Sequence, residues 1–203
     1  MRGPLTYDDL QEREDAAEGS DPDLHREAAA DLLAWASEPH PDDDPEASRA
    51  ELLVSAAEQL SMAGDREPAL GVLREAVATG EPVNPDVRAF LINGLLECGR
   101  GDEADKVADD LRHERPENVM VHDLVGTAYE RAGRLDVALR WFTMGVLRAV
   151  SWGDDVDDLD GLNALMLMSS RYRVRQAMGF PPDEFDEIAA DVLDTEDELR
   201  REL

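Results

Sequence analysis

The residues whose types suit metal binding or nucleophilic chemistry are an acidic cluster at 154–160, four histidines and one cysteine. Part of the acidic cluster resembles a calcium-binding EF-hand loop with Gly161 at its sixth position. In that register Val156 and Leu167 occupy positions one and twelve, where carboxylates are required. We therefore interpret the cluster as a solvated linker that caps the following helix.

The histidines and the cysteine show no arrangement typical of a catalytic or metal site. His25, His40, His113 and His122 share no metal-ligand spacing with one another or with Cys98. A lone cysteine is more often a small buried residue than a nucleophile. The motifs of serine hydrolases, zinc proteases and nucleotide-binding loops are absent from the sequence. We predict that the chain is not an enzyme and binds no metal or cofactor.

The chain is strongly acidic, with a formal charge of −28 from 48 acidic and 20 basic residues. Residues 1–49 carry −11, residues 50–153 carry −7 and residues 154–203 carry −10. A nucleic-acid backbone or an anionic membrane surface would be repelled by this charge. We therefore expect neither as a partner. Lys106 is the single lysine, which fits either a salty cytoplasm or a GC-rich genome.

The sequence predicts a cytoplasmic globular protein. Hydrophobic residues make up 42% of it, enough to bury a core. The sequence contains no run of 18 or more apolar residues, the length that a membrane-spanning helix requires. The N-terminal residues lack the apolar segment of a signal peptide.

Three glycines that are each followed five residues later by an alanine recur at intervals of 35 and 34 residues. Each glycine follows a stretch with helical apolar spacing, and each alanine begins another. This pattern predicts three helix–turn–helix units. The pairs are Gly64 and Ala69, Gly99 and Ala104, and Gly133 and Ala138.

The third unit shows most clearly how such a hairpin would pack. Gly126 and Ala138 are small where two antiparallel helices approach, and Tyr129 and Phe142 can fill the space between them. Gly133 would end the first helix in the left-handed conformation, which costs least without a Cβ. We predict a closely packed helical pair.

These positions resemble the tetratricopeptide (TPR) consensus, although its tryptophan is replaced by Leu53, Arg88 and His122. The whole chain is similar to a bacterial group of uncharacterised repeat proteins. The resemblance implies an all-α, right-handed α-solenoid of about three repeats with capping helices at both ends. Some members of that group carry a zinc-binding tail, whose cysteines this chain lacks. The expected repeat region is 46–152, divided at about 48–83, 84–118 and 119–152.

The flanking segments are expected to cap the repeats. An N-terminal segment, 1–45, contains a predicted helix over 23–37, and its first 19 residues either fray or form a short helix. An acidic linker and a capping helix are expected in 153–180, the helix over 159–178. An acidic amphipathic tail, 181–203, has Phe185, Ile188, Ala189 and Val192 on its apolar side.

The resemblance also implies that the first helix of each repeat lines a concave groove that binds peptides. Of the residues that hold a terminal carboxylate in one TPR variant, only Asn93 is matched here. Because the groove residues are mixed and mildly acidic, they fit a neutral or basic peptide. The implied groove residues are Val54, Glu58, Met62, Asn93, Leu96, Glu97, Asp123, Thr127, Glu130 and Arg131.

A basic patch of Arg171 and Arg175, which share a helix face, stands out in this acidic chain. These arginines either neutralise nearby aspartates or bind an acidic partner or the chain's own acidic tail.

The sequence thus favours a non-catalytic adaptor that binds a peptide or helix of a protein partner. The alternative is a self-associating structural module, or a regulatory subunit, whose groove is occupied by its own C-terminal tail or by a second copy.

Overall fold

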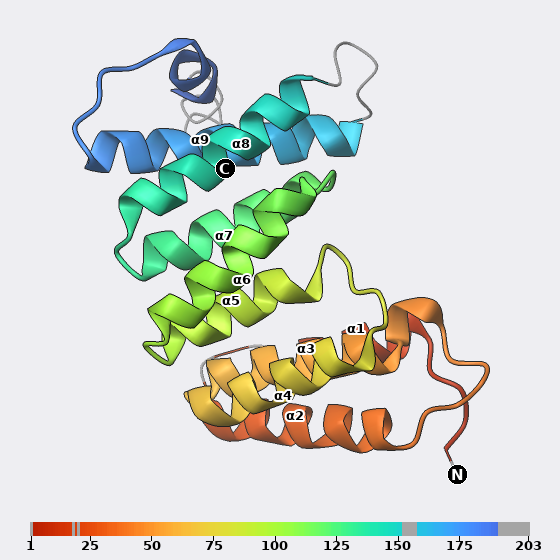
Figure 1. Ribbon diagram of the computed structural model, residues 1–203. Helices are drawn as coiled ribbons and strands as arrows, with labels where there is room; N and C mark the ends of the chain where they lie inside the picture. Colours follow the sequence, from red (N-terminus) through yellow and green to blue (C-terminus); the bar gives the residue numbers. More distant parts are fainter. Residues whose placement is uncertain (1, 18, 20, 152–157, 191–203) are drawn as a thin grey trace. The chain divides into compact units, whose positions relative to one another are not determined.

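The computed structural model describes residues 2–17, 19, 21–151 and 158–190, and this part of the chain contains helices but no strand (Figure 1). The predicted all-α class is therefore confirmed for these residues. The chain divides into two compact units, Met1–Asp109 and Asp110–Leu203. The helices are α1 (Tyr7–Asp15), α2 (Pro22–Ser37), the short 3₁₀ helix η1 (Pro45–Ala47), α3 (Arg49–Met62), α4 (Arg66–Thr79), α5 (Val87–Glu97), α6 (Gly101–Glu114), α7 (Val119–Arg131), α8 (Leu135–Val150) and α9 (Asp158–Ala177).

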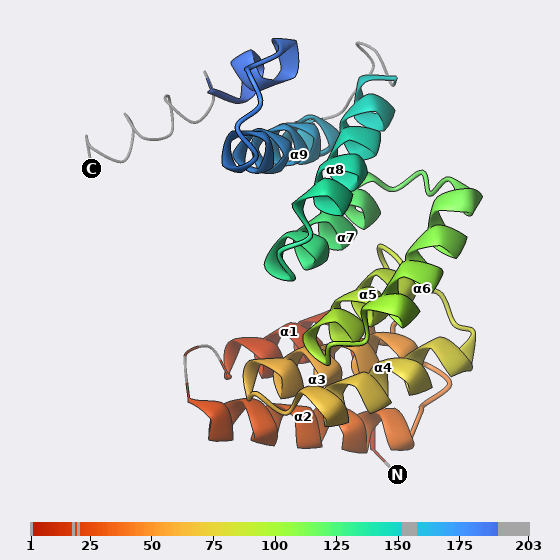
Figure 2. The same cartoon turned by 60° about the vertical axis from the view of Figure 1, so that its left-hand side comes forward.

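The first unit is built on α3, which packs against α2 and α4 and also contacts α5. α1 lies against both α2 and α3, as the second view shows (Figure 2). The core consists of alanine and leucine side chains, so the helices can approach closely. Its fully buried members include Ala28, Leu32, Leu52, Leu53, Ala56, Leu70, Ile92 and Leu95.

α2 begins one residue earlier than the predicted helix and ends where predicted, at Ser37. The side chain of Asp21 accepts a hydrogen bond from the backbone N–H of Asp23, which caps the helix. Pro22 occupies the first turn, where its missing N–H costs nothing. Local start signals thus explain this helix.

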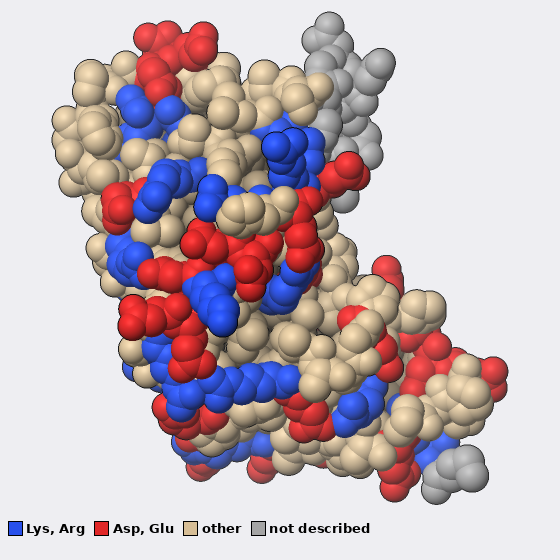
Figure 3. Space-filling model, viewed as in Figure 1, with Lys and Arg blue, Asp and Glu red and all other residues tan. Residues whose placement is uncertain are grey.

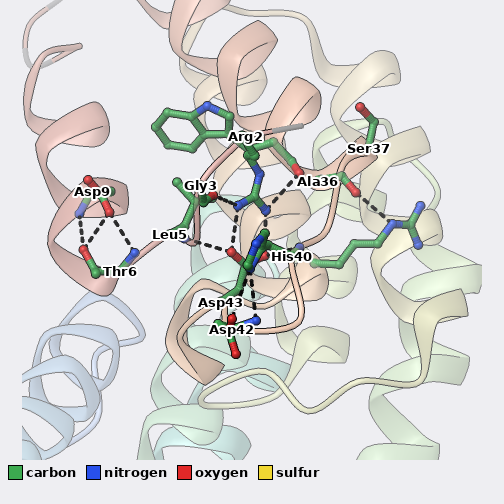
Figure 4. Close-up of polar contacts among 12 residues, drawn as sticks. Arg2, Gly3, Leu5, Thr6, Asp9, Ala36, Ser37, His40, Asp42 and Asp43 are labelled. Atoms are coloured by element: carbon green, nitrogen blue, oxygen red, sulfur yellow. Dashed lines mark hydrogen bonds and ion pairs between the residues drawn. The ribbon is translucent and has the colours of Figure 1, made fainter.

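The N-terminal residues form an ordered helix instead of fraying, and a half-buried ion pair holds the segment before it (Figure 4). Thr6 and Asp9 form a capping box at the start of α1. The guanidinium of Arg2 donates two hydrogen bonds to Asp43, at 2.7 and 2.6 Å. Asp43 also accepts hydrogen bonds from the backbone N–H groups of Leu5 and His40, both at 2.8 Å. The carboxylate therefore ties the N-terminal segment to the loop before α3.

The predicted turns all contain a left-handed glycine, with φ of 86° at Gly64, 70° at Gly99 and 73° at Gly133. In each turn the N–H after the glycine donates to a carbonyl five residues earlier, which is the Schellman arrangement. The same geometry recurs at Gly179, after α9. The donor and acceptor pairs are Asp65 to Leu60, Arg100 to Leu95, Arg134 to Tyr129, and Phe180 to Arg175.

The second unit is built on the pair α7 and α8, with α9 packed against both. Tyr129 and Phe142 are fully buried, as predicted. A Cβ at Gly126 would lie 2.5 Å from Cε1 of Phe142, so only glycine permits this helix crossing. The predicted close approach is therefore observed.

The tail is helical over 184–190, and the residues that it buries coincide only partly with its predicted apolar side. Ile188 is 45% exposed, whereas Asp186 is only 1% exposed and Ala189 is fully buried. The physical reason is that Asp186 forms ion pairs with Arg171 and Arg175 of α9. Val192 and most of the acidic linker, 152–157, lie outside the described residues.

Candidate functional site

The groove residues expected in the first unit lie on α3 and α5. Val54, Glu58 and Met62 recur at four-residue intervals and therefore share one face of α3. Val54 is buried at 3% exposure, whereas Glu58 is exposed and Met62 is 62% exposed. The solvent-facing end of this stripe is thus formed by an acidic and a flexible apolar side chain.

On α5, Asn93, Leu96 and Glu97 are all half-buried. Glu97 accepts hydrogen bonds from the Ser61 hydroxyl at 2.6 Å and from Nδ2 of Asn93 at 3.1 Å. Ser61 lies on α3, so this chain of bonds connects the first helices of two successive hairpins. Asn93 and Glu97 therefore already have partners within the unit.

The corresponding residues of the second unit contact α9. Glu130 accepts two hydrogen bonds from Arg173, at 2.8 and 2.7 Å. Asp123 accepts one from the Ser170 hydroxyl at 3.3 Å, and desolvation raises the pKa of Asp123. Thr127 is half-buried, and Arg131 is exposed.

In the first unit, two of the expected groove residues line a recess. A recess of about 290 Å³ lies among α1, α2, α3 and the residues after α1. Glu58 and Met62 line it, so the structure brings two of the predicted groove residues together. Its other lining side chains include Glu14, Asp15, His25 and Gln59.

The recess has an acidic character. Among the residues that the structure describes, Glu14, Asp15 and Glu58 form no ion pair with a basic side chain. Desolvation, together with the charges of Glu14 and Glu51, raises the pKa of Glu58 to about 7. A carboxylate with this pKa would gain free energy from a cation placed beside it.

A buried histidine forms the inner side of the recess. Nδ1 of His25 lies 2.7 Å from Oε1 of Gln59, and its Nε2 lies 3.0 Å from the carbonyl oxygen of Gly19. His25 is only 5% exposed and Gln59 only 6%. These contacts connect α2, α3 and the residues after α1, so the recess has an ordered wall.

Sequence reasoning found Glu58 and Met62 but missed Glu14, Asp15 and His25. The first two lie in the N-terminal segment, whose weak apolar pattern suggested nothing about where it would pack. His25 carried a usable signal, because a histidine beside the apolar stripe of α2 is often buried with polar partners.

Arg171 and Arg175 bind the chain's own carboxylates. Arg171, 5% exposed, donates to Asp186 at 2.8 Å and to Asp183. Nε of Arg175 donates to the second carboxylate oxygen of Asp186 at 2.7 Å. The Arg171 guanidinium holds the pKa of Asp183 at about 2. Of the interpretations left open by the sequence, pairing with nearby aspartates of the tail matches these contacts.

The described part of the chain contains no group of three or more histidine, cysteine, aspartate or glutamate side chains placed to hold a metal ion. Cys98 is half-buried, and desolvation and Glu67 raise the pKa of its thiol. A thiol with a raised pKa is less available as a thiolate. Each described helix is too short or too polar to cross a lipid bilayer.

The described part of the chain is thus all-helical and carries an acidic recess in its first unit. Comparison of the chain with protein-family models gave no match. Comparisons with curated proteins and with solved structures gave no significant match either.

Proposed function

We propose that the chain is a non-catalytic, cytoplasmic adaptor of the tetratricopeptide type that binds a peptide or helix of a partner protein. In the first unit the contact site is the acidic recess between α1 and α3. The observation that carries this proposal is the recess itself, which combines an exposed methionine with carboxylates that have no basic partner among the described residues.

The recess suits a basic side chain with an apolar neighbour. An arginine or lysine of the partner would place its charge beside Glu58, Glu14 and Asp15, whose carboxylates lack a basic partner among the described residues. Its aliphatic stem, or the next side chain, would pack on Met62, which adapts easily to different shapes. Burial of Met62 would add hydrophobic free energy to the electrostatic attraction.

A fluorescence-anisotropy titration tests this proposal. The probe is a labelled peptide with arginine and leucine in alternation, and the reference peptide has citrulline in place of arginine. We expect the arginine peptide to bind more tightly. We expect Glu58→Lys to weaken it by about tenfold, and Met62→Ser by about threefold, since each removes one part of the contact.

Glu27→Lys is the matched control, because Glu27 is an exposed residue of α2 outside the recess and the charge change is identical. It should alter the affinity by less than about twofold, because dissolved salt screens a charge that lies outside the recess. Equal weakening by Glu27→Lys and Glu58→Lys would show that net charge alone attracts the peptide, and would reject the recess as the site.

The second candidate is a self-associating structural module whose groove is occupied by its own C-terminal residues or by a second copy, and the contacts of α9 favour the first of these occupants in the second unit. Because Ser170 and Arg173 bind Asp123 and Glu130, the chain itself covers part of the surface assigned to a partner. Sedimentation of the full chain over a range of concentrations measures its oligomeric state and tests whether a second copy takes part. A monomer at all concentrations contradicts self-association.

A further inference from the structure

A second recess, of about 350 Å³, lies in the second unit and has a basic rim. It is formed where α6 ends, α7 begins and the last turns of α8 pass. The side chains that line it are of two main kinds, basic and apolar. They include Arg112, Arg115, Arg148, His122, Met144 and Leu147.

The backbone holds two of these arginines in place. Arg115 follows α6 with φ of 55°, a left-handed conformation that is uncommon for a residue other than glycine or asparagine. Its backbone N–H donates to the carbonyl of Arg112 at 3.2 Å. Arg148, on α8, donates from its guanidinium to the carbonyl of Arg115 at 3.1 Å. The guanidinium of Arg148 is therefore fixed to the backbone of Arg115, and both arginines line the same recess.

Arg115 and Arg148 differ from most arginines of this protein in lacking a carboxylate partner within the described ranges. Elsewhere basic and acidic side chains lie next to each other, as the visible surface shows (Figure 3). Two unpaired cations in one recess are unexpected in a chain with a charge of −28. Their free N–H donors are suited to bidentate pairing with an added carboxylate.

The interior of the recess is apolar. Leu147 is 56% exposed and Met144 is half-buried, so both offer surface to a ligand. The ring of His122 is buried against Trp141, with ring centroids 5.5 Å apart. Desolvation and the charge of Arg148 lower the pKa of His122, so the ring is neutral near pH 7. The floor therefore suits an uncharged side chain.

We propose that this recess binds an acidic peptide segment of a partner protein. Its carboxylates pair with Arg115 and Arg148, and one apolar side chain between them packs on Leu147 and Met144. A small inorganic anion would use the arginines but would leave both apolar side chains in water. The volume suits one or two side chains, in the lower range of ligand pockets. This surface is separate from the acidic recess of the first unit, and it selects the opposite charge.

Binding of a labelled peptide with the pattern Asp-Leu-Asp tests the proposal, with Asn-Leu-Asn as the reference. Arg115→Asn suits the left-handed backbone and Arg148→Gln keeps a polar, uncharged side chain on the helix, so both variants should fold. We expect the double variant to bind the acidic peptide about tenfold more weakly than the wild type, because two charge-assisted hydrogen-bonded pairs are lost. Arg140→Gln, which removes an exposed arginine of the same unit outside the recess, should change binding by less than about twofold.

Three outcomes would overturn the proposal. Equal binding of the Asn and Asp peptides would show that the arginines are not used. Unchanged binding by a double variant that keeps the wild-type Tm would place the peptide elsewhere. Competition by inorganic phosphate as strong as that by the unlabelled peptide, at equal ionic strength, would show a general anion site in which the apolar floor takes no part.

Discussion

Asp43 accepts four hydrogen bonds, two from Arg2 and two from backbone N–H groups, while its side chain is only 11% exposed. The Arg2 guanidinium and these N–H groups hold the pKa of Asp43 well below its usual range. This carboxylate connects segments 41 residues apart in the chain. It is thus the main polar attachment of the N-terminal residues to the loop after α2.

The first prediction concerns this attachment. Asp43→Asn should lower the free energy of unfolding by about 2 kcal/mol at pH 7, because it removes charge-assisted hydrogen bonds from Arg2. Since the folded-state pKa of Asp43 is depressed, its contribution is present above the unfolded-state pKa of about 3.9 and is lost as the pH falls further. The difference in unfolding free energy between wild type and variant, measured by urea titration, should therefore become smaller below about pH 4. Asp42→Asn, a change at an 81% exposed neighbour, is the control and should be nearly neutral.

The second prediction concerns the buried Asp186. Asp186→Asn should destabilise the second unit by about 3 kcal/mol, because Arg171 and Arg175 would lose a buried carboxylate partner. Glu184→Gln, at an exposed position on the same helical segment, should cost less than about 0.5 kcal/mol. Thermal unfolding of both variants measures the difference. Equal Tm values for the Asp186→Asn and Glu184→Gln variants would show that the tail does not support α9.

Truncation after Gly179 removes the same ion pairs. It should therefore destabilise this unit as well, and not merely free a binding surface.

The sequence predicted the parts of the fold that depend on local chemistry. The bounds of α2 followed from Asp21 and Pro22, and the turns followed from the spacing of glycines. Gly126 and Phe142 were recognised as contact positions, and a Cβ at Gly126 would indeed collide with that ring. Each of these inferences needs only the nearest turn or the neighbouring helix.

The features that were missed depend on contacts between distant segments. The pairing of Arg2 with Asp43 and the acidic contribution of α1 to the recess leave no periodic signal. The apolar side of the tail was assigned by helical spacing and included Ile188, which is 45% exposed. The ion pairs of Asp186 determine which side is buried, and a hydrophobic pattern does not contain that information.

The third prediction uses two helical glycines with opposite environments. Gly126→Ala should destabilise the protein by about 1–3 kcal/mol, because the new methyl group would overlap the ring of Phe142. Gly71→Ala should stabilise it by about 0.5–1 kcal/mol, because nothing lies within 4 Å of the new methyl and alanine favours helix. Chemical denaturation of both variants measures these changes in unfolding free energy, which should have opposite signs. Stabilisation by Gly126→Ala would contradict the close crossing of α7 and α8.

The fourth prediction concerns the pH dependence due to Glu58. Its folded-state pKa is raised to about 7, so the folded protein retains this proton where the unfolded chain has lost it. Stability should therefore decline as the pH rises from about 4.5 to 7 and then level off. Glu58→Gln should remove this decline, raising Tm at pH 8 while leaving it nearly unchanged at pH 5. Because the side chain is partly open to water, the gain at pH 8 should stay near 1 kcal/mol.

The other charges around Glu58 provide the control for that measurement. Glu14 and Asp15 line the same recess and Glu51 acts on the same carboxylate, so neutralising Glu14 should lower the pKa of Glu58. Glu14→Gln should then shift the decline in stability to lower pH. An unchanged profile in this variant would show that desolvation alone raises the pKa.

The central claim is that a partner's basic segment contacts the acidic recess, and the methyl resonance of Met62 reports on it most directly. Met62 is 62% exposed and lines the recess, whereas Met144 lines the basic recess of the other unit. In protein labelled with ¹³C at the methionine methyl groups, titration with the arginine–leucine peptide should shift the Met62 resonance to saturation and leave Met144 in place. A Met62 resonance that stays unchanged while the peptide is bound would contradict the claim.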